Sequence, residues 1–185
     1  MKLVTLTLNI TEDQIYNGLI EVFSDITGLD PNKGEIRRAY QLQSQPGWRH
    51  TDNVISFWLT NNSDIYHEDI MDSYDFSGPI VKNSTFTQVL SCNISCYGPN
   101  SKDMALLIWA GIQSDENRLA LSKLKIYPVP KNAPPNYVPY QYNNQWWNRT
   151  DITLIFNVYT NISNEINSIK SVEINLNNKI EKEIK

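Results

Sequence analysis

The stretch Thr85-Phe-Thr-Gln-Val-Leu-Ser-Cys-Asn-Ile-Ser-Cys-Tyr97 runs directly into Gly98-Pro99-Asn100-Ser101, and this junction decides the fold. The first segment carries β-branched and aromatic residues among polar ones and predicts a strand. Glycine and proline then end the strand, and Ser101 is expected to be the N-cap of a helix with Asp103 in its first turn. A strand that passes at once into a helix is therefore the central unit of the predicted domain.

A second helix is predicted near the N-terminus, where Thr11 and Gln14 form a capping box and Gly28 supplies the stop. Apolar residues recur between these caps at helical spacing. A third helical piece is predicted from Ser114 to Leu121. The predicted strands and extended segments are 1–10, 40–45, 53–60, 66–74 as a hairpin arm, 124–129, 132–142 as a loop rich in proline and tyrosine, 149–160 and 168–177.

Together these elements predict an α+β fold: mainly antiparallel β-sheet, with two main α-helices packed on one face and long loops. The length of 185 residues suits a single core of ordinary size. A composition of 41% hydrophobic and 19% charged residues is typical of a globular chain. We expect one domain over residues 1–177 and a charged C-terminal tail over residues 178–185, where lysine and glutamate are mixed.

The formal net charge is −4, and the sequence shows no basic block or stripe. Attraction to nucleic-acid phosphate is therefore not expected to be the main role of the surface, although this charge still allows a lumen that meets passing DNA. No apolar run approaches the roughly 20 residues that a membrane span needs. The N-terminus also lacks the apolar core of a signal peptide, so we expect cytosolic synthesis and no membrane partner.

The chain has two cysteines, Cys92 and Cys96, and both fall on the strand quoted first. Residues four apart on a strand point the same way but lie roughly 13 Å apart, which is too far for a disulfide. A C-x3-C pair without further cysteine or nearby histidine is also a poor zinc signal. We therefore expect two buried free thiols.

No catalytic motif is recognisable in the sequence. Glycine-rich phosphate loops, H-E-x-x-H pairs and G-x-S-x-G elbows are all absent from it. His50 stands alone, and His67 is followed by Glu68 and Asp69; we interpret both histidines as parts of solvated polar loops. We therefore expect that this protein is not an enzyme and that it has no catalytic residue, no metal ligand and no cofactor.

Carboxylates gather in one segment, at Asp64, Glu68, Asp69, Asp72 and Asp75. Hard oxygen ligands suit calcium or magnesium, but the spacing fits no EF-hand. We interpret the cluster as an acidic rim for a basic partner, and cation binding stays open as the alternative.

Aromatic residues are more informative than these polar ones. Trp146 and Trp147 stand side by side before a predicted strand, where adjacent residues point to opposite faces. One of them is then expected to enter the core and the other to stay exposed, as tryptophan often is at protein interfaces. The alternative is that both pack inside the chain under the proline-rich loop. The candidate interface residues are Trp146, Trp147, Tyr66, Tyr74, Asp69 and Asp72.

Several stretches resemble the neck terminator (tail terminator) proteins of tailed bacteriophages. The similarity is carried by Tyr97-Gly98-Pro99-Asn100-Ser101 and by Gln145-Trp146-Trp147-Asn148-Arg149-Thr150-Asp151 before a long strand. Further matching features come in the same order, namely the N-terminal amphipathic helix, Pro46 to Trp48, Tyr127 to Pro130 and Ile169 to Ile174. The resemblance extends from about Thr11 to Leu176 and is weakest over 64–82 and in the Lys/Glu tail.

This resemblance implies a structural protein of the virion, at the neck–tail junction, that assembles in the host cytoplasm. Such proteins are similar to head-to-tail connectors whose subunits form a homo-oligomeric ring, commonly of six. The ring caps the tail tube, docks on neck or adaptor proteins, and lets genome DNA pass through its lumen with transient, non-specific contact. A closed ring needs two different patches on each subunit, which suits exposed edge strands, loops and aromatic anchors.

Three alternatives remain at this point. One is another connector piece, such as a head-closure (stopper) or tail-completion protein. Another is a metal-dependent phage enzyme that uses His50, His67 and the acidic segment. A third is a module that binds a host factor as a monomer, which its mass in solution distinguishes from a ring.

Overall fold

The computed structural model describes residues 6–40, 47–62, 69–130 and 133–166, together with the backbone of residues 172–176 and 179–184. The interface candidate Tyr66 and almost all of the strand predicted over 40–45 lie outside these ranges. Within them, no helix is both long and apolar enough to cross a membrane.

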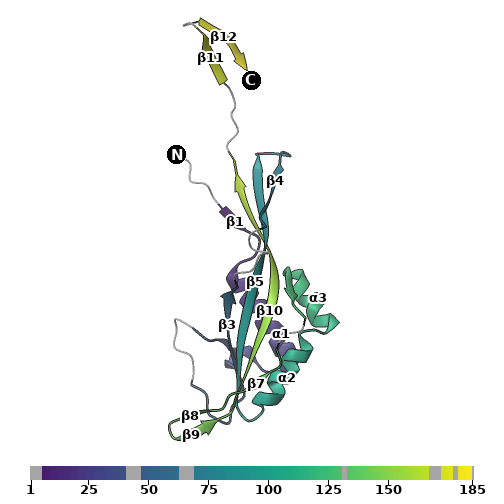
Figure 1. Cartoon of the computed structure of the whole chain (residues 1–185), viewed down its shortest axis with the longest axis vertical. Helices are drawn as coiled ribbons and strands as arrows, with labels where there is room; N and C mark the ends of the chain where they lie inside the picture. The colour runs from purple at the N-terminus through teal and green to yellow at the C-terminus, as the bar shows by residue number, and fades with distance from the viewer. Residues whose placement is uncertain are drawn as a thin grey trace.

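Two 17-residue strands form the spine of the molecule (Figure 1). β5 (Val81–Tyr97) and β10 (Arg149–Glu165) pair antiparallel over their whole length. The strands predicted over 85–97 and 149–160 are thus confirmed. β5 begins before its predicted start and β10 continues beyond its predicted end, because residues 81–85 pair with residues 161–165.

The main sheet has the strand order β1-β10-β5-β3-β2. β3 is antiparallel to β5 and β2 is parallel to β3, so the sheet is mixed. β4 pairs with the first residues of β5, and β6 and β7 pair with β10. The bounds are β1 Leu6–Leu8, β2 Ile36–Arg38, β3 Val54–Asn61, β4 Met71–Asp75, β6 Ile126–Pro128 and β7 Asn136–Tyr137.

Two short sheets lie outside the main one. β8 (Tyr140–Tyr142) pairs with β9 (Gln145–Trp147), and β11 (Val172–Leu176) pairs with β12 (Lys179–Ile184). The predicted loop over 132–142 thus contains two short strands, β7 and β8. The predicted tail over 178–185 contains β12, and the boundary between domain and tail at residue 178 stays a prediction.

In the described part of the chain, three α-helices complete the fold, α1 (Glu12–Thr27), α2 (Ser101–Gly111) and α3 (Asp115–Lys123), with one 3-10 turn, η1 (Pro31–Lys33). The predicted capping box at α1 is confirmed, and its C-cap glycine is left-handed with φ 72°. The prediction of Ser101 as an N-cap is wrong, since Asn100 takes that position and Ser101 is the first residue of α2. The buried Ser101 hydroxyl instead accepts a 3.3 Å hydrogen bond from Thr150 on β10.

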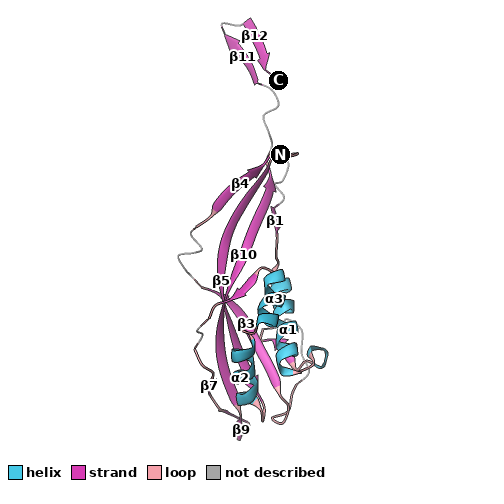
Figure 2. Ribbon diagram, turned by 90° about the vertical axis from the view of Figure 1, so that its right-hand side faces the viewer, coloured by secondary structure: helices cyan, strands magenta, loops and turns pink. Residues whose placement is uncertain are grey.

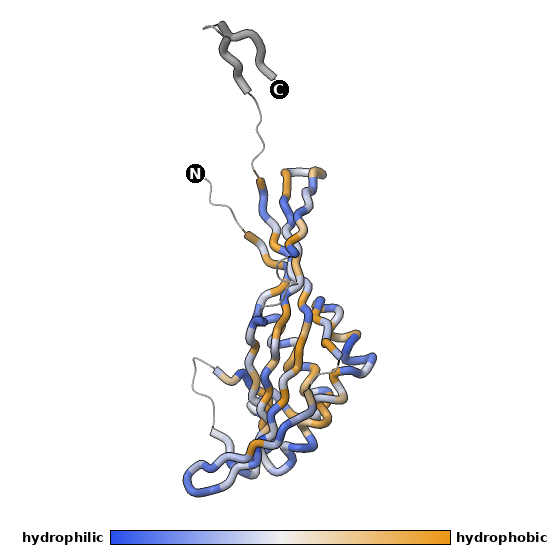
Figure 3. Tube along the Cα trace, viewed as in Figure 1, coloured by the Kyte–Doolittle hydropathy of each residue, from blue (hydrophilic) through white to orange (hydrophobic). Residues whose placement is uncertain are grey.

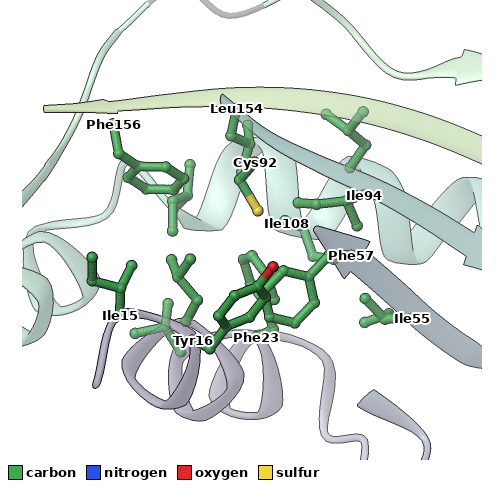
Figure 4. Packing of buried hydrophobic residues seen from close by; sticks show 14 of the residues in the cluster. Ile15, Tyr16, Phe23, Ile55, Phe57, Cys92, Ile94, Ile108, Leu154 and Phe156 are labelled. Atoms are coloured by element: carbon green, nitrogen blue, oxygen red, sulfur yellow. The ribbon is translucent and has the colours of Figure 1, made fainter. Parts of the chain in front are cut away.

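The helices cover one face of the sheet, as predicted (Figure 2). Alternate residues of β5 and β10, from Leu90 to Cys96 and from Ile152 to Val158, point into the core that α1 and α2 close. Figure 4 shows Phe23 of α1 against Phe57 of β3, with the ring centroids 5.3 Å apart in an edge-to-face contact. The predicted α+β class is therefore confirmed, with α3 as a third helix that buries only Leu121.

Hydrogen-bonded polar side chains line the other face of the sheet. Thr153 of β10 donates to Asn93 of β5 at 3.1 Å, and Asn93 donates to Thr60 of β3 at 3.2 Å. Ser95 donates to Asp151, which also pairs with Arg149 at 2.7 Å. This face therefore carries a network of hydroxyl and amide groups whose carboxylate, Asp151, is paired with an arginine.

The sheet continues past the helices at one end of the molecule (Figures 1 and 2). This extension, called the arm below, consists of β1, β4 and the paired residues 81–86 of β5 and 160–165 of β10. The hairpin predicted at 66–74 exists in part, because β4 pairs with β5 through a turn at 76–80. Hydrophobic residues recur along the arm although no helix covers it (Figure 3).

Candidate assembly surfaces

The arm exposes large apolar side chains. Between 51% and 71% of the surface of each of the following is accessible: Leu6, Leu8, Met71, Tyr74 and Phe76. They lie on the two outer strands of the arm and on the turn after β4, and exposed apolar side chains gathered in one region often mark interaction sites. Of these residues, only Tyr74 was among the interface candidates from the sequence. The apolar residues of 1–10 alternate as in a strand, and this alternation was the available signal for β1; the exposure of Leu6 and Leu8 is seen only in the structure.

Ion pairing holds β4 on the arm. Asp72 of β4 accepts a hydrogen bond from Lys82 of β5 at 2.7 Å and another from Ser84 at 2.6 Å. The bond from Lys82 is the main reason why the pKa of Asp72 lies below the ordinary aspartate value. The Asp72 carboxylate is therefore hydrogen-bonded within its own subunit. On the same strand, the ring of Tyr74 stacks on that of Phe76, with the centroids 6.4 Å apart.

The acidic segment does not gather into a cation site in the described part of the chain. Asp75 is occupied by the backbone N–H of Ser77 at 2.9 Å, which lowers its pKa, and Asp69 precedes β4 at an exposed position. Among the described residues, no three acidic, histidine or cysteine side chains are placed to hold a metal ion. Asp64, Glu68 and His67 lie outside those residues.

A groove lies at the root of the arm, where the helices begin to cover the sheet. Its volume is about 700 Å³. The apolar part of its wall comes from β1 and α1 on one side and from β3 and β5 on the other. The apolar lining residues are Leu8, Ile10, Ile15, Leu59, Phe86 and Leu90. Apolar surface thus continues from the core through the groove to the edge strand β1.

The opposite end of the molecule is aromatic. Trp146 and Trp147 are adjacent on β9 but face opposite ways, as strand alternation predicts. Trp146 is 69% exposed, whereas Trp147 lies 6.2 Å from the ring of Tyr140 and 6.1 Å from that of Tyr142. Trp147 therefore packs within the chain, and Trp146 stays available for a partner.

A chain of rings ties this hairpin to the main sheet. Tyr140 contacts Tyr97 at the end of β5, and Tyr97 contacts Trp48, with ring centroids 6.0 and 5.5 Å apart. The turn between β8 and β9 is made by Asn143 and Asn144, both with positive φ. The hairpin was missed in the sequence, where an Asn-Asn pair between aromatic runs was the available signal.

Among the described residues, the remaining polar candidates form no catalytic arrangement. His50 lies against the Trp147 ring at 6.2 Å and belongs to the aromatic end. Cys92 and Cys96 are free, buried thiols as predicted, and burial raises the pKa of Cys96 to about 12. Such thiols are poor nucleophiles at neutral pH.

The family model described as phage neck terminator protein matches residues 13–180. This chain belongs to the phage neck terminator protein family. A comparison with curated proteins finds no match.

Membership of the neck terminator family fits a molecule whose exposed features are contact surfaces. A neck terminator is a structural protein of the phage neck, and it associates with other neck and tail proteins. The match covers α1 from its second residue, all of the main sheet except β1, and β11. The arm and the aromatic end both lie within it, apart from β1.

Proposed function

We propose that this neck terminator forms a ring of identical subunits that caps the tail tube and joins it to the neck or adaptor proteins. Genome DNA passes through the hole in the ring. The arm is the observation that carries this proposal. A sheet that projects beyond its helices with apolar residues on two separate edges supplies two different contact surfaces, which a head-to-tail ring requires.

The aromatic end is the proposed docking surface for a neighbouring component of the neck or tail. Exposed Trp146 and Tyr142 stand on a two-stranded hairpin that the contacts of Trp147 hold in place. Aromatic anchors on a rigid support bury a large area with little loss of side-chain entropy. The arm lies at the other end of the spine, so ring contacts and docking contacts can be made without overlap (Figure 1).

The polar face of the sheet supports passage of DNA. Its hydroxyl and amide groups bond one another, and its Arg149 is paired with Asp151, so this cation is not free to bind phosphate tightly. A wall of this chemistry, with the net charge of −4, lets a polyanion slide past without strong binding.

Mass in solution is the first test. Light scattering of the purified full-length protein, followed by negative-stain imaging of the same peak, should show closed rings with a central hole. If the free protein is monomeric, the same imaging is repeated after adding it to purified tails that lack it, where a ring at the tail end is expected. Six subunits are the expected number.

Two results would contradict the proposal. A strict monomer that binds neither tails nor necks would exclude a terminator ring. Rings that bind filled heads and not tails would instead indicate a head-closure protein.

A further inference from the structure

Both outer strands of the arm have a free edge. In the described part of the chain, the arm has the strand order β1-β10-β5-β4, and no strand pairs with the outer side of β1 or β4. Every residue of β1 and β4 is exposed. Proteins often protect such edges with charged side chains, lysine above all, or with proline or a bulge, because a bare edge recruits strands from other chains. Neither β1 nor β4 contains lysine or proline. β4 carries Asp72 and Asp75, and Asp72 is paired with Lys82 of its own subunit.

The directions of these two strands are opposite. Each neighbouring pair in the arm is antiparallel, so β1 runs along β5 and β4 runs along β10. A second subunit placed beside the first in the same orientation therefore sets its β4 antiparallel to the first subunit's β1. The alternation of strand directions then continues without interruption from one subunit to the next.

The two edges also lie at the same level along the arm. The pairing registers place residues in three rows: Leu6, Asn164, Lys82, Tyr74; then Thr7, Ser163, Asn83, Ser73; then Leu8, Ile162, Ser84, Asp72. Subunits can therefore join edge to edge without a shift along the strands. A repeated head-to-tail contact of this kind closes into a ring when the rotation from one subunit to the next completes a full turn.

The backbone N–H and C=O groups of alternate residues of β1 point away from β10, toward the free edge. The N–H of Asn9 donates to the carbonyl of Asn161 on β10. Because antiparallel strands direct alternate residues to opposite sides, Thr7 bonds β10 in the same way. The backbone groups of Leu6 and Leu8 consequently point to the free edge.

The backbone N–H and C=O groups of β4 alternate in the same way, and those that point outward lie in the same rows as those of β1. The N–H of Ile166 donates to Ile80, so the even-numbered residues of β5 bond β10 and the odd-numbered ones bond β4. Ser73 therefore bonds β5, and the backbone groups of Asp72 and Tyr74 point outward. These two residues are in the same rows as Leu8 and Leu6 of β1.

We propose that β1 of one subunit pairs with β4 of the next, so that the arms join into one continuous antiparallel sheet around the ring. Leu6 then lies opposite Tyr74, and Leu8 lies opposite Asp72, each pair exchanging backbone hydrogen bonds. The Leu6 and Tyr74 side chains share one face and cover each other. This inference rests on the ring of the proposed function and specifies which strands close it.

Engineered disulfides test the register. Thr7 and Ser73 form the non-hydrogen-bonded pair of the proposed contact, with Cα atoms about 4.5 Å apart, which a disulfide can bridge. The full-length double variant Thr7→Cys/Ser73→Cys is oxidised both free and bound to purified tails. A non-reducing gel should show a ladder of covalent multimers up to the ring size. The native Cys92 and Cys96 do not interfere because both are fully buried.

Matched variants separate this contact from others. Thr7→Cys/Tyr74→Cys places the two thiols on opposite faces and should stay monomeric, as should each single variant. Dimers from Ser73→Cys alone would show two β4 edges pairing about a two-fold axis and would overturn the inference. Rings seen by imaging without a ladder would also overturn it while leaving the proposed function intact. Absence of both rings and tail binding would remove the proposed function and this contact with it.

Discussion

The backbone N–H of Leu59 on β3 donates a 3.0 Å hydrogen bond to the hydroxyl of Tyr16 on α1. The parallel pairing of β2 with β3 ends at Arg38 opposite Phe57, so no strand reaches this N–H among the described residues. A side chain from the helix layer thus takes the place of a missing strand at the edge of the sheet. The contact fixes α1 against the sheet beside the groove at the root of the arm.

Replacement of Tyr16 by phenylalanine should lower the free energy of unfolding by about 1 kcal/mol, because the N–H of Leu59 loses its partner while the ring still packs. Urea denaturation of the full-length protein measures this change. Tyr40→Phe is the control, since Tyr40 is 82% exposed and its change should stay within about 0.5 kcal/mol. Equal stability of wild type and Tyr16→Phe would show that water replaces the tyrosine.

Gly98→Ala should destabilise the strand-to-helix junction by about 2 kcal/mol or more. Gly98 has φ 104°, and a Cβ there would lie 2.3 Å from the backbone oxygen of Asp52. Gly78→Ala is the matched control, because nothing lies within 4 Å of its Cβ position. Thermal unfolding of both variants should show a clear drop in Tm for the first alone; a similar Tm for the two would contradict this account of the junction.

Alanine variants of Trp146 and Trp147 should have different effects, one on docking and the other on stability. Trp147→Ala removes the ring that packs on Tyr140 and Tyr142 and should destabilise the protein by about 2 to 3 kcal/mol. Trp146→Ala should leave the unfolding free energy within about 0.5 kcal/mol of wild type and weaken binding to tails or necks. Unfolding curves and co-sedimentation with purified tails measure the two effects. Normal co-sedimentation of a stable Trp146→Ala variant would remove this residue from the docking surface.

Acid should loosen β4. The pKa of Asp72 is lower in the folded chain than its ordinary value because Lys82 and Ser84 donate to its carboxylate. Its contribution to stability is therefore present above the ordinary aspartate pKa of about 3.9 and is lost as the pH falls through the lower, folded value. The pKa of Lys82 is raised by Asp72, so the lysine's contribution is lost only as the pH rises through that raised value.

Hydrogen exchange of the β4 amides across this acid range measures the loosening. In Asp72→Asn, the β4 amides should exchange faster than in the wild type at neutral pH. Their protection should then show no further drop as the pH falls through the folded-state pKa of Asp72. Asp69→Asn, on the same segment but outside the ion pair, should keep this drop. A drop that persists in Asp72→Asn would assign the effect to another group.

Local chemistry was readable from the sequence where neighbouring residues decide the outcome. The Thr11–Gln14 capping box, the stop at Gly28 and the alternation in 149–160 depend on contacts within a few residues, and all three appear in the structure. The prediction of the α2 N-cap was wrong because a residue distant in the sequence takes part in the outcome. The Ser101 hydroxyl is taken by Thr150, a residue 49 positions away.

The sequence by itself determined the elements, the α+β class, the buried cysteines and the family, because spacing, caps and motifs are local properties of the chain. Only the tertiary structure decided that β5 and β10 extend beyond the helices, and that β1 lies in the same rows as Asp72 to Tyr74 of β4 on the two outer edges of the arm. Register between distant strands depends on how the whole core packs, and no local pattern encodes it. The surfaces proposed for assembly arise from that register.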